Sequence, residues 1–568
     1  MPKNPKEMYM ANISKLAKNA KSKEEFNKIK HRLAKNSGLK EVPKNAEIFS
    51  SIKKENNLDM LLKTKPVRTI SGVAPVAIMT QPIACPPQAQ CTYCPGGPSS
   101  IFGHTPKSYT DGAPAVKRAI RNKYDPYFQT LNRLEHYILL NQNPSKVELI
   151  IMGGTFPSFP KTYRTNFITY ALKAMNDFSD KFYKNGVLQQ KAFNKFFLLP
   201  GNMNSKEREE ILLKKMEQNK GESTLEKEQG KNETKKIRCT AMVIETRPDC
   251  CFEPEINDML SLGATRVELG VQNIKNKVLE ITKRGHSVGE TIKASQLLKD
   301  SFLKTTYHMM LGSPLTTSKS DIDDFKELFS NPDFKPDSLK IYPCLVMAGT
   351  PLYEDYKKGK FTPMNTEDAI KRIITIKKHI PEYCRIMRIQ RDIPTYMTEA
   401  GVDRTNLRQM ISNKLKEAKE KCRCIRCREP KNKEVDYSNI KTKIKKYDSS
   451  NGTEIFISKE DVKKDIILGY VRLRIPFKPF RKEITSKSAG IRELHVFGTA
   501  LDLKKSPKKS SEAQHRGLGK QLMLEAEKIA KEEYEKNKML VISGIGVREY
   551  YKRQLGYTQD GPYVSKKI

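Results

Sequence analysis

The chain has 568 residues, which is too long for a single hydrophobic core and long enough for two or three domains. Lys and Arg outnumber Asp and Glu by 104 to 65, a formal net charge of +39, which favours a polyanionic partner such as RNA or DNA over a merely soluble, Lys-rich surface. The sequence has no apolar run of the length of a membrane span and no signal-peptide core in residues 1–21, so we expect a cytosolic protein without a membrane partner.

Residues 1–65 predict a basic helical arm, because Lys and Arg recur between apolar residues at helical spacing. From residue 66 to 394, β-type apolar segments alternate with amphipathic helical stretches, the pattern of a parallel sheet built from βα units. The expected strands are Val73–Met79, Val147–Met152, Ala241–Glu245, Arg266–Val271, Thr306–Leu311 and Leu339–Val346. Six such units indicate a complete or partial (β/α) barrel of the TIM type, whose chemistry lies at the carboxyl ends of its strands.

The pattern breaks down between residues 180 and 236, where the sequence is highly charged and low in complexity. We interpret this stretch as an insertion made of a helix and a mobile loop, peripheral to the chemistry.

Three cysteines, Cys85, Cys91 and Cys94, follow the first expected strand. Three thiolates on one loop can hold three irons of a four-iron cluster and leave the fourth iron open to a small chelating molecule. Tyr93, before the last cysteine, could pack against the adenine of that molecule. The alternative is a zinc knuckle, for which His104 is the closest further ligand. The loop resembles the radical S-adenosylmethionine (SAM) signature, although five residues rather than the common three separate its first two cysteines.

Further residues of this kind follow the later strands. Gly153, Gly154 and Thr155 resemble the segment that receives the methionyl amino group in that superfamily, although Gly-Gly after a strand is also typical of a tight turn. Glu245 and Gln272 stand at strand ends where ribose and carboxylate contacts would be made, or where structural ion pairs would form.

A second cysteine group, Cys422, Cys424 and Cys427, lies in a basic segment that we assign to a linker at residues 395–436. Three thiolates are one ligand short of a closed tetrahedral zinc site. His495 is the first candidate for the fourth ligand and His515 the second. Such a zinc ion would be structural, and the alternative is a set of unligated cysteines.

Residues 437–568 predict a third, α+β domain. Successive N–H groups at a glycine-permitted helix start form an anion cradle, and the segment before the last long helix resembles the pyrophosphate loop of GNAT acetyltransferases. Its residues are Gln514, His515, Arg516, Gly517, Leu518, Gly519 and Lys520. Downstream, Tyr550 or Tyr551 could meet the thioester with its hydroxyl group, although a tyrosine at a helix end is also common in core packing.

Taken in order, these motifs resemble the family of Elongator catalytic subunits, in which a radical SAM barrel is joined to a GNAT domain. The resemblance covers about Lys65 to Ile568. It implies a 4Fe-4S cluster on Cys85, Cys91 and Cys94, S-adenosylmethionine, acetyl-CoA and zinc. It also implies that acetyl-CoA contacts Lys146, Glu493, Leu494, His495, Val496, the loop Gln514–Lys520 and Tyr551.

The implied activity is modification of the wobble uridine of tRNA at carbon 5. A 5′-deoxyadenosyl radical would remove hydrogen from the acetyl methyl group of acetyl-CoA, the carbon radical would add to uracil, and thioester hydrolysis would leave a carboxymethyl group. The implied partners are the anticodon stem-loop of tRNA, an electron donor, and either Elongator-like subunits or a second copy. The alternatives are a protein-lysine (histone) acetyltransferase with a structural barrel and a non-catalytic RNA-binding scaffold.

Overall fold

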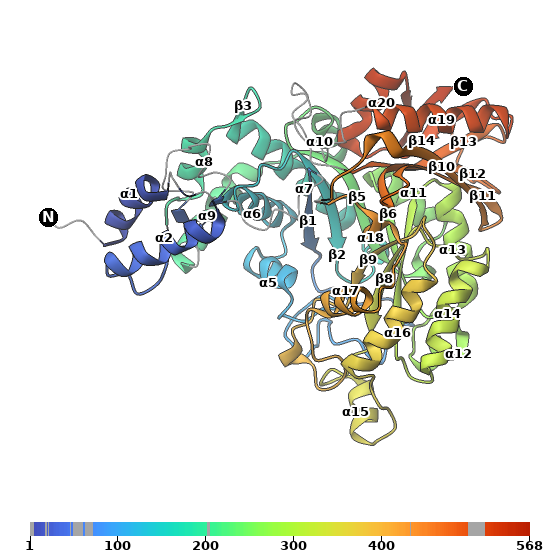
Figure 1. Ribbon diagram of the computed structural model, residues 1–568, viewed down its shortest axis with the longest axis horizontal. Coiled ribbons are helices and arrows are strands. Elements are labelled where there is room, and N and C mark those ends of the chain that lie inside the picture. The colour runs from blue at the N-terminus through green and yellow to red at the C-terminus, as the bar shows by residue number, and fades with distance from the viewer. Residues whose placement is uncertain are drawn as a thin grey trace.

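The computed structural model describes residues 5–17, 20, 22–45, 47–48, 61–62, 72–201, 205–431, 433–497 and 517–568 (Figure 1). A helical arm, a central barrel and a carboxyl-terminal α+β unit follow one another along the chain. Within these residues we find no helix with both the length and the apolar character that crossing a membrane requires.

The central barrel is an open, seven-stranded parallel sheet whose strands pair in sequence order, which confirms the predicted partial (β/α) barrel. It contains the six predicted strands and one more, β9, which was not predicted. The strands are β1 (Val73–Met79), β2 (Lys146–Met152), β5 (Arg238–Thr246), β6 (Arg266–Gln272), β7 (Lys304–Leu311), β8 (Ser338–Pro343) and β9 (Arg385–Ile389).

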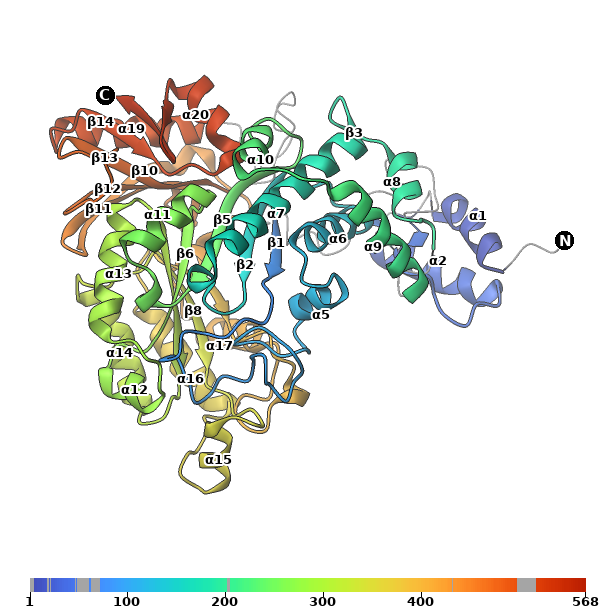
Figure 2. The ribbon, with the colours of Figure 1, turned by 180° about the vertical axis from the view of Figure 1, so that it is seen from behind.

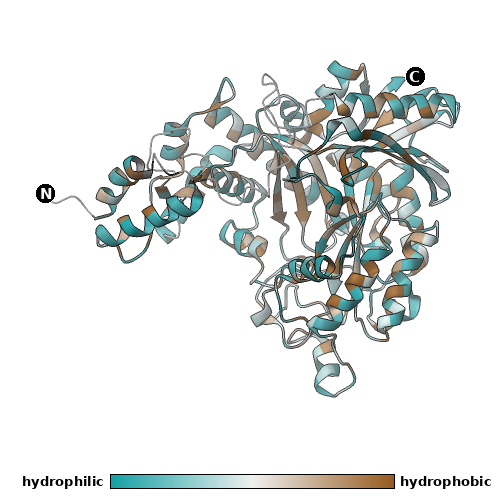
Figure 3. Cartoon of the chain, in the orientation of Figure 1, coloured by the Kyte–Doolittle hydropathy of each residue, from teal (hydrophilic) through white to brown (hydrophobic). Residues whose placement is uncertain are grey.

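Helices cover the outer face of this sheet because alternate strand residues such as Val147, Leu149 and Ile151 are apolar and fully buried against them. Figure 3 shows the hydrophobic residues gathered on the barrel strands and the hydrophilic ones on the outer sides of the helices. The helices of this unit are α5 (Pro114–Arg121), α6 (Pro126–Leu139), α7 (Lys161–Phe182), α11 (Glu253–Leu262), α12 (Asn276–Ile281), α13 (Val288–Asp300), α14 (Ser318–Ser330), α15 (Pro351–Lys357), α16 (Thr366–Lys378) and α17 (Leu407–Glu417). Of these, α15 projects beyond the carboxyl ends of the strands and does not cover the sheet (Figure 1).

The charged insertion has more helical structure than the sequence led us to expect. It forms a small hairpin of β3 (Tyr183–Lys184) and β4 (Val187–Leu188) and three helices, α8 (Gln190–Phe196), α9 (Lys206–Lys220) and α10 (Leu225–Asn232). Phe193 and Phe197 pack against Phe178 and Phe182 of α7. Buried hydrogen bonds from the Asn176 amide to Glu228 and from Asn232 to Asn176 hold α10 on the same helix.

The amino-terminal arm contributes α1 (Pro5–Ala17) and α2 (Lys23–Asn36), as the basic helical pattern predicts. The Ser22 hydroxyl caps α2 by accepting a hydrogen bond from the Glu25 N–H at 3.1 Å. Tyr9, Ile13 and Phe26 are buried. Both ribbon views show the arm beside α8 and α9 rather than against the barrel strands (Figures 1 and 2).

The carboxyl-terminal unit is a seven-stranded sheet in the order β10-β11-β12-β13-β14-β16-β15, in which only β13 and β14 pair in parallel. Helix α19 packs on β11, β12 and β13. The elements are β10 (Ile440–Ser449), β11 (Gly452–Asp461), β12 (Ile466–Ile475), β13 (Ser488–Val496), α19 (Leu518–Glu532), β14 (Lys538–Val541), α20 (Arg548–Leu555), β15 (Thr558–Asp560) and β16 (Tyr563–Lys567).

This unit docks on the amino-terminal ends of the barrel strands, so the strands point away from it in Figure 1. At Gly544 and Gly546 a Cβ atom would lie 2.1 Å from the Thr240 carbonyl oxygen and 2.4 Å from the Arg238 Cβ, so only glycine permits this close approach to β5. Buried ion pairs hold the same junction. Arg474 in β12 pairs with Asp300 at the end of α13 (2.7 Å), and Lys304 of β7 pairs with Glu493 of β13.

Candidate functional site

The three-cysteine loop lies at the carboxyl end of the barrel, as predicted. Cys85, Cys91 and Cys94 are free, half-buried thiols. Each sulfur has a different hydrogen-bond partner from another part of the chain. Cys85 Sγ lies 3.6 Å from Thr155 Oγ1, Cys94 Sγ accepts from the Ser108 N–H at 3.2 Å, and Cys91 Sγ accepts from Arg284 Nη1 at 3.0 Å.

Backbone contacts fix the loop in place. The Thr92 N–H donates to the Thr282 carbonyl (3.1 Å), and the Leu352 N–H donates to the Thr92 carbonyl (3.0 Å). Tyr93, the residue considered for adenine packing, lies with Met310 and Leu352 in a small apolar cluster. Burial raises the pKa of the Tyr93 hydroxyl, so this ring stays neutral.

The Gly-Gly-Thr segment after β2 reaches this loop. Gly153 and Gly154 have φ angles of 110° and 69°, which favour glycine. A Cβ atom on Gly153 would lie 2.6 Å from Thr80 Oγ1, which donates to the Gly153 carbonyl. The structure therefore brings Thr155 and Cys85 together, although 69 residues separate the two segments.

A chain of largely buried ion pairs lies on the inner face of the barrel. Glu148 pairs with Arg266 (2.8 Å) and Arg266 pairs with Glu268 (3.2 Å). Lys340 bridges Glu268 and Glu245, with 3.0 Å between its Nζ and Glu245 Oε1. We refer to these five residues as the barrel ion-pair chain.

Two of these carboxylates have further partners. The Tyr109 hydroxyl donates to Glu245 Oε2 at 2.8 Å, and His308 Nε2 lies 2.8 Å from Glu268 Oε2. Burial alone would raise the pKa of Glu268, but Lys340 and His308 hold that pKa well below its usual range. Oxygens of Glu245 and Glu268 and a ring nitrogen of His308 lie within 4.8 Å of one another.

Gln272, the other strand-end residue predicted to bind the cofactor, has a φ of 67°, and its side-chain oxygen is buried without a hydrogen-bond partner in the described residues. His286 was not singled out from the sequence. Its ring is buried, and the Val271 backbone is a polar partner of it. The unpaired, buried oxygen of Gln272 fits a contact to a bound molecule.

The predicted acetyl-CoA residues lie at the opposite end of the barrel or in the carboxyl-terminal unit. Lys146 begins β2, and burial, together with Arg238, lowers the pKa of its ammonium group. Leu494, His495 and Val496 lie in β13, and Leu518, Gly519 and Lys520 begin α19 after Gly517, whose φ of 73° favours glycine. Gln514, His515 and Arg516 lie outside the described residues.

The two tyrosines of α20 differ in their surroundings. A Cβ atom on Gly519 would lie 3.2 Å from the Tyr550 hydroxyl oxygen, so Tyr550 sits over the start of α19. The Tyr551 ring is packed in the core of the unit and is only 7% exposed. Neither hydroxyl group makes a hydrogen bond to a residue that the structure describes.

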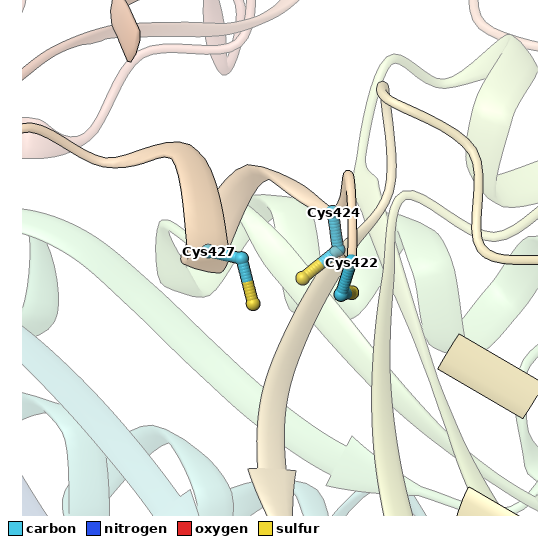
Figure 4. Close-up of side chains that lie close together, drawn as sticks. All are labelled: Cys422, Cys424 and Cys427. Atoms are coloured by element: carbon cyan, nitrogen blue, oxygen red, sulfur yellow. The ribbon is translucent and has the colours of Figure 1, made fainter. Parts of the chain in front are cut away.

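The second cysteine group is compact. Cys422, Cys424 and Cys427 have sulfur atoms within 4.8 Å of one another, and Cys427 lies on the short helix α18 (Ile425–Arg428; Figure 4). Zn–S bonds of 2.3 Å in a tetrahedron require sulfur atoms about 3.8 Å apart, so this spacing fits one metal ion. The sulfurs of Cys85, Cys91 and Cys94, all of them described, form no group this tight, which suits a wider cluster with one iron per thiolate.

The predicted fourth ligand, His495, does not join this group. Its ring stacks on Tyr470, with ring centroids 5.7 Å apart, and contacts Phe497. His515 lies outside the described residues. Instead, the buried Lys377 ammonium lies 3.6 Å from Cys427 Sγ. Cys384, which was not singled out from the sequence, is fully buried near Cys424, and burial and the neighbouring Cys424 raise the pKa of its thiol.

Four protein-family models match the chain in succession. They are the ELP3 N-terminal domain at residues 8–70, the Radical SAM superfamily at 85–328, the Radical_SAM C-terminal domain at 336–417 and the Acetyltransferase (GNAT) family at 420–557. The radical SAM match begins at Cys85. The central and carboxyl-terminal units are therefore a radical SAM barrel and a GNAT domain, as predicted.

The chain is also similar over nearly its whole length to characterised proteins. It is 47% identical to the tRNA uridine(34) acetyltransferase of Methanocaldococcus infernus, covering 93% of this chain and 92% of that protein. It is 39% identical to Elongator complex protein 3 of Saccharomyces cerevisiae, covering 93% and 89%. The solved structure of the M. infernus Elp3 lacking residues 1–46 aligns with a TM-score of 0.71 at 44% identity, covering 88% of this chain and all of that chain.

Proposed function

The chain belongs to the Elongator protein 3 family, and we propose that it installs a carboxymethyl group at carbon 5 of the wobble uridine of tRNA, with acetyl-CoA as the carbon donor. The relatives are named for acetyl transfer to tRNA uridine 34, and the family models supply the two catalytic units that such a reaction needs. The carboxymethyl product is our proposal, because it makes use of both units in one reaction.

One observation carries this proposal: the three-cysteine loop and the GNAT domain lie at opposite ends of one barrel and are joined through its inner face by buried charged residues. Strands of seven residues such as β2 span about 23 Å at 3.3 Å per residue. The acetyl end of a cofactor held by the GNAT domain would therefore have to reach along the inside of the barrel. The barrel ion-pair chain lies along this path; its residues are Glu148, Arg266, Glu268, Lys340 and Glu245.

Cys85, Cys91 and Cys94 are the residues that would hold a 4Fe-4S cluster, and Gly153, Gly154, Thr155, Glu245 and Gln272 those that would hold S-adenosylmethionine. The free thiols, their spacing and the unpaired oxygen of Gln272 fit these groups. When bound, the cluster and S-adenosylmethionine supply an organic radical. The surrounding apolar side chains, Tyr93, Met310 and Leu352 among them, would exclude water from it.

Acetyl-CoA would be held by Lys146, Glu493, Leu494, His495, Val496, the loop Gln514–Lys520 and Tyr551. Successive N–H groups at the start of α19 suit a pyrophosphate. The hydroxyl groups of Tyr550 and Tyr551, unpaired among the described residues, are free to donate to the thioester oxygen while the acetyl group is presented.

The anticodon stem-loop of tRNA would be bound electrostatically. Exposed Lys28, Arg32 and Lys35 on α2 and Lys441 and Lys445 on the edge strand β10 offer cationic surface on the arm and on the GNAT domain. An electron donor is required, and Elongator-like subunits or a second copy are further candidate partners. A zinc ion on Cys422, Cys424 and Cys427 would stabilise the segment between the two units.

The test is anaerobic incubation of the reconstituted protein with tRNA, acetyl-CoA, S-adenosylmethionine and a reductant, followed by mass spectrometry of the tRNA nucleosides. We expect carboxymethyluridine and 5′-deoxyadenosine from the wild type. Cys91→Ala should abolish both products and retain tRNA binding, whereas Cys239→Ala, which removes a buried thiol of β5, should retain both.

Two results would contradict the proposal. Full modification by Cys91→Ala would refute the role of the cysteine loop. Acetylation of histone peptides without S-adenosylmethionine, in the absence of tRNA products, would instead support a protein-lysine acetyltransferase.

A further inference from the structure

Arg284 is a buried cation whose described polar contacts include a cysteine sulfur and no carboxylate. Its side chain follows α12, at the carboxyl end of the barrel, and the residue is 6% exposed. Nη1 donates to Cys91 Sγ at 3.0 Å, and Nη2 donates to the Gly270 carbonyl at 2.6 Å. A buried guanidinium stays charged and is costly unless an anion lies beside it. Of the groups that Arg284 hydrogen-bonds among the described residues, only the Cys91 sulfur can carry a negative charge, and the Asp249 carboxylate acts on it from further away.

Two backbone contacts place the turn that contains Arg284 against the cysteine loop. Gly285 has a φ of 68°, and a Cβ atom there would lie 2.2 Å from the Gln88 carbonyl oxygen, so the cysteine loop lies directly on this turn. The hydrogen bond from the Thr92 N–H to the Thr282 carbonyl fixes the same two segments from the other side. Backbone contacts therefore place this turn against the cysteine loop, and the Gly270 carbonyl holds the other arm of the guanidinium.

Among the three sulfurs of the loop, Cys91 alone accepts a hydrogen bond from a charged group in the described residues. Cys85 contacts the neutral Thr155 hydroxyl, and Cys94 accepts from the neutral Ser108 amide. Hydrogen bonds from charged donors are about twice as strong as neutral ones. The three sulfurs therefore differ in how strongly their negative charge is stabilised.

We propose that Arg284 sets the reduction potential of the iron–sulfur cluster through its hydrogen bond to Cys91. The inference rests on the proposed function, because it assumes that the loop holds such a cluster. Reduction adds one electron and one negative charge to the cluster. A fixed guanidinium at one thiolate stabilises that added charge, so it moves the potential to more positive values and makes the electron easier to accept.

The experiment is a redox titration of the reconstituted, full-length protein, followed by visible absorption and electron paramagnetic resonance, without S-adenosylmethionine, acetyl-CoA or tRNA. Arg284→Gln removes the charge, and Arg284→Lys keeps a charge but loses the planar fork. We expect both variants to hold iron and to titrate at more negative potentials, with the larger shift for Arg284→Gln. Arg372→Gln is the control, because Arg372 is a partly buried arginine that pairs with Asp321 at 2.7 Å, and the potential of the cluster in this variant should not move.

If both Arg284 variants hold iron and titrate at the wild-type potential, the proposal is overturned. If their iron-free forms fail to fold, as judged by circular dichroism, Arg284 is a structural residue and the proposal is likewise overturned. Variants that fold but lose iron, while Arg372→Gln keeps it, would also overturn the proposal, because Arg284 would then be required for binding the cluster rather than for setting its potential. A wild-type protein that binds no iron would instead count against the proposed function itself.

Discussion

The guanidinium group of Arg492 in β13 meets the carboxylate of Asp337, which precedes β8, at a distance of 2.6 Å between Nη2 and Oδ2. Both side chains are fully buried at the junction of the GNAT domain and the barrel. Arg492 also pairs with Glu454 at 2.9 Å, and Asp337 also receives a hydrogen bond from the Thr305 N–H at 2.8 Å. Buried ion pairs therefore stabilise the junction, and each charge in them needs its partner because water does not reach it.

Replacing one of these charges should destabilise the protein strongly. Asp337→Asn would leave the guanidinium groups of Arg492 and Arg472 buried without their shared partner. We expect a loss of roughly 3–5 kcal/mol in the free energy of unfolding, measured by urea denaturation. Glu354→Gln, which breaks an ion pair with Lys357 in which both side chains are about half exposed (53% and 50%), should have a much smaller effect. Equal effects of the two substitutions would argue against a junction held by buried charge.

The same pair predicts a pH dependence. Burial alone would raise the pKa of Asp337, but the guanidinium groups of Arg492 and Arg472 lower that pKa to about 2, from 3.8 for a free aspartate. A carboxyl group with a lowered pKa in the folded state stabilises that state above its unfolded pKa, and this stabilisation is lost as the pH falls toward the folded pKa. The difference in unfolding free energy between wild type and Asp337→Asn should therefore be constant above about pH 5 and shrink between about pH 4 and pH 2. A difference that grows on acidification would contradict this assignment.

The compact thiol group predicts a bound metal ion. Purified wild-type protein should contain about one zinc ion in addition to the cluster iron, and Cys424→Ser should remove most of that zinc and lower the melting temperature. Metal content is measured by mass spectrometry of the digested protein. His495→Ala should keep its zinc, because the His495 ring lies against Tyr470 and Phe497 and not among the three sulfurs. Loss of zinc in His495→Ala would instead support His495 as the fourth zinc ligand, as the sequence suggested.

The sequence predicted the local features of this fold well and the long-range ones less completely. β-type apolar segments that alternate with amphipathic helical stretches identified six barrel strands, and the spacing of three cysteines identified the loop that contains Cys91. The strand β9 was missed because two of its five residues are arginines. Arg385 is tolerated there because it pairs with Glu429 at 2.5 Å, a partner distant in sequence. The same limit applies to Arg284, whose contact with Cys91 spans 193 residues.

The charged insertion illustrates the other limit. Its composition is typical of a mobile loop, yet α9 and α10 pack on the helices of the barrel through a few buried residues, among them Met216 of α9 and Asn232 of α10, which donates to Asn176 of α7. The composition of a segment is an average over all its residues. It therefore does not show that a few buried residues are enough to order a helix in a highly charged segment.

Removing the hydroxyl group of Tyr551 should lower activity without lowering the stability of the fold. The Tyr551 ring is packed in the GNAT core, while the hydroxyl has no hydrogen-bond partner among the described residues. Tyr551→Phe should keep the melting temperature and lower acetyl-CoA turnover by about 10²-fold, the order seen when one donor to a developing oxyanion is removed. Tyr551→Ala should also lose roughly 3–5 kcal/mol of stability through the cavity that it creates. Unchanged turnover in Tyr551→Phe, with a loss in Tyr550→Phe, would move the role to Tyr550.

The ion pairs of Lys340 connect the cysteine end of the barrel with the end that faces the GNAT domain. The Lys340 ammonium group bridges Glu245 and Glu268, and Glu268 pairs onward with Arg266 toward the end that faces the GNAT domain. Lys340→Met would leave two buried carboxylates without their shared cation, at a cost of roughly 3–5 kcal/mol, and a double variant with Glu268→Gln should recover part of it.

Lys340 contacts none of the three cysteines and no GNAT residue in the described structure, and Glu245 keeps its hydrogen bond from the Tyr109 hydroxyl when Lys340 is replaced. We therefore expect Lys340→Met, where folded, to retain 5′-deoxyadenosine formation and acetyl-CoA binding. Formation of the modified uridine should fall at least tenfold, since that step alone requires the acetyl group inside the barrel. The three quantities are measured on one preparation by chromatography of deoxyadenosine, calorimetry of acetyl-CoA binding and nucleoside mass spectrometry. A parallel loss of deoxyadenosine would show that the barrel ion-pair chain supports the radical end rather than the passage between the two ends.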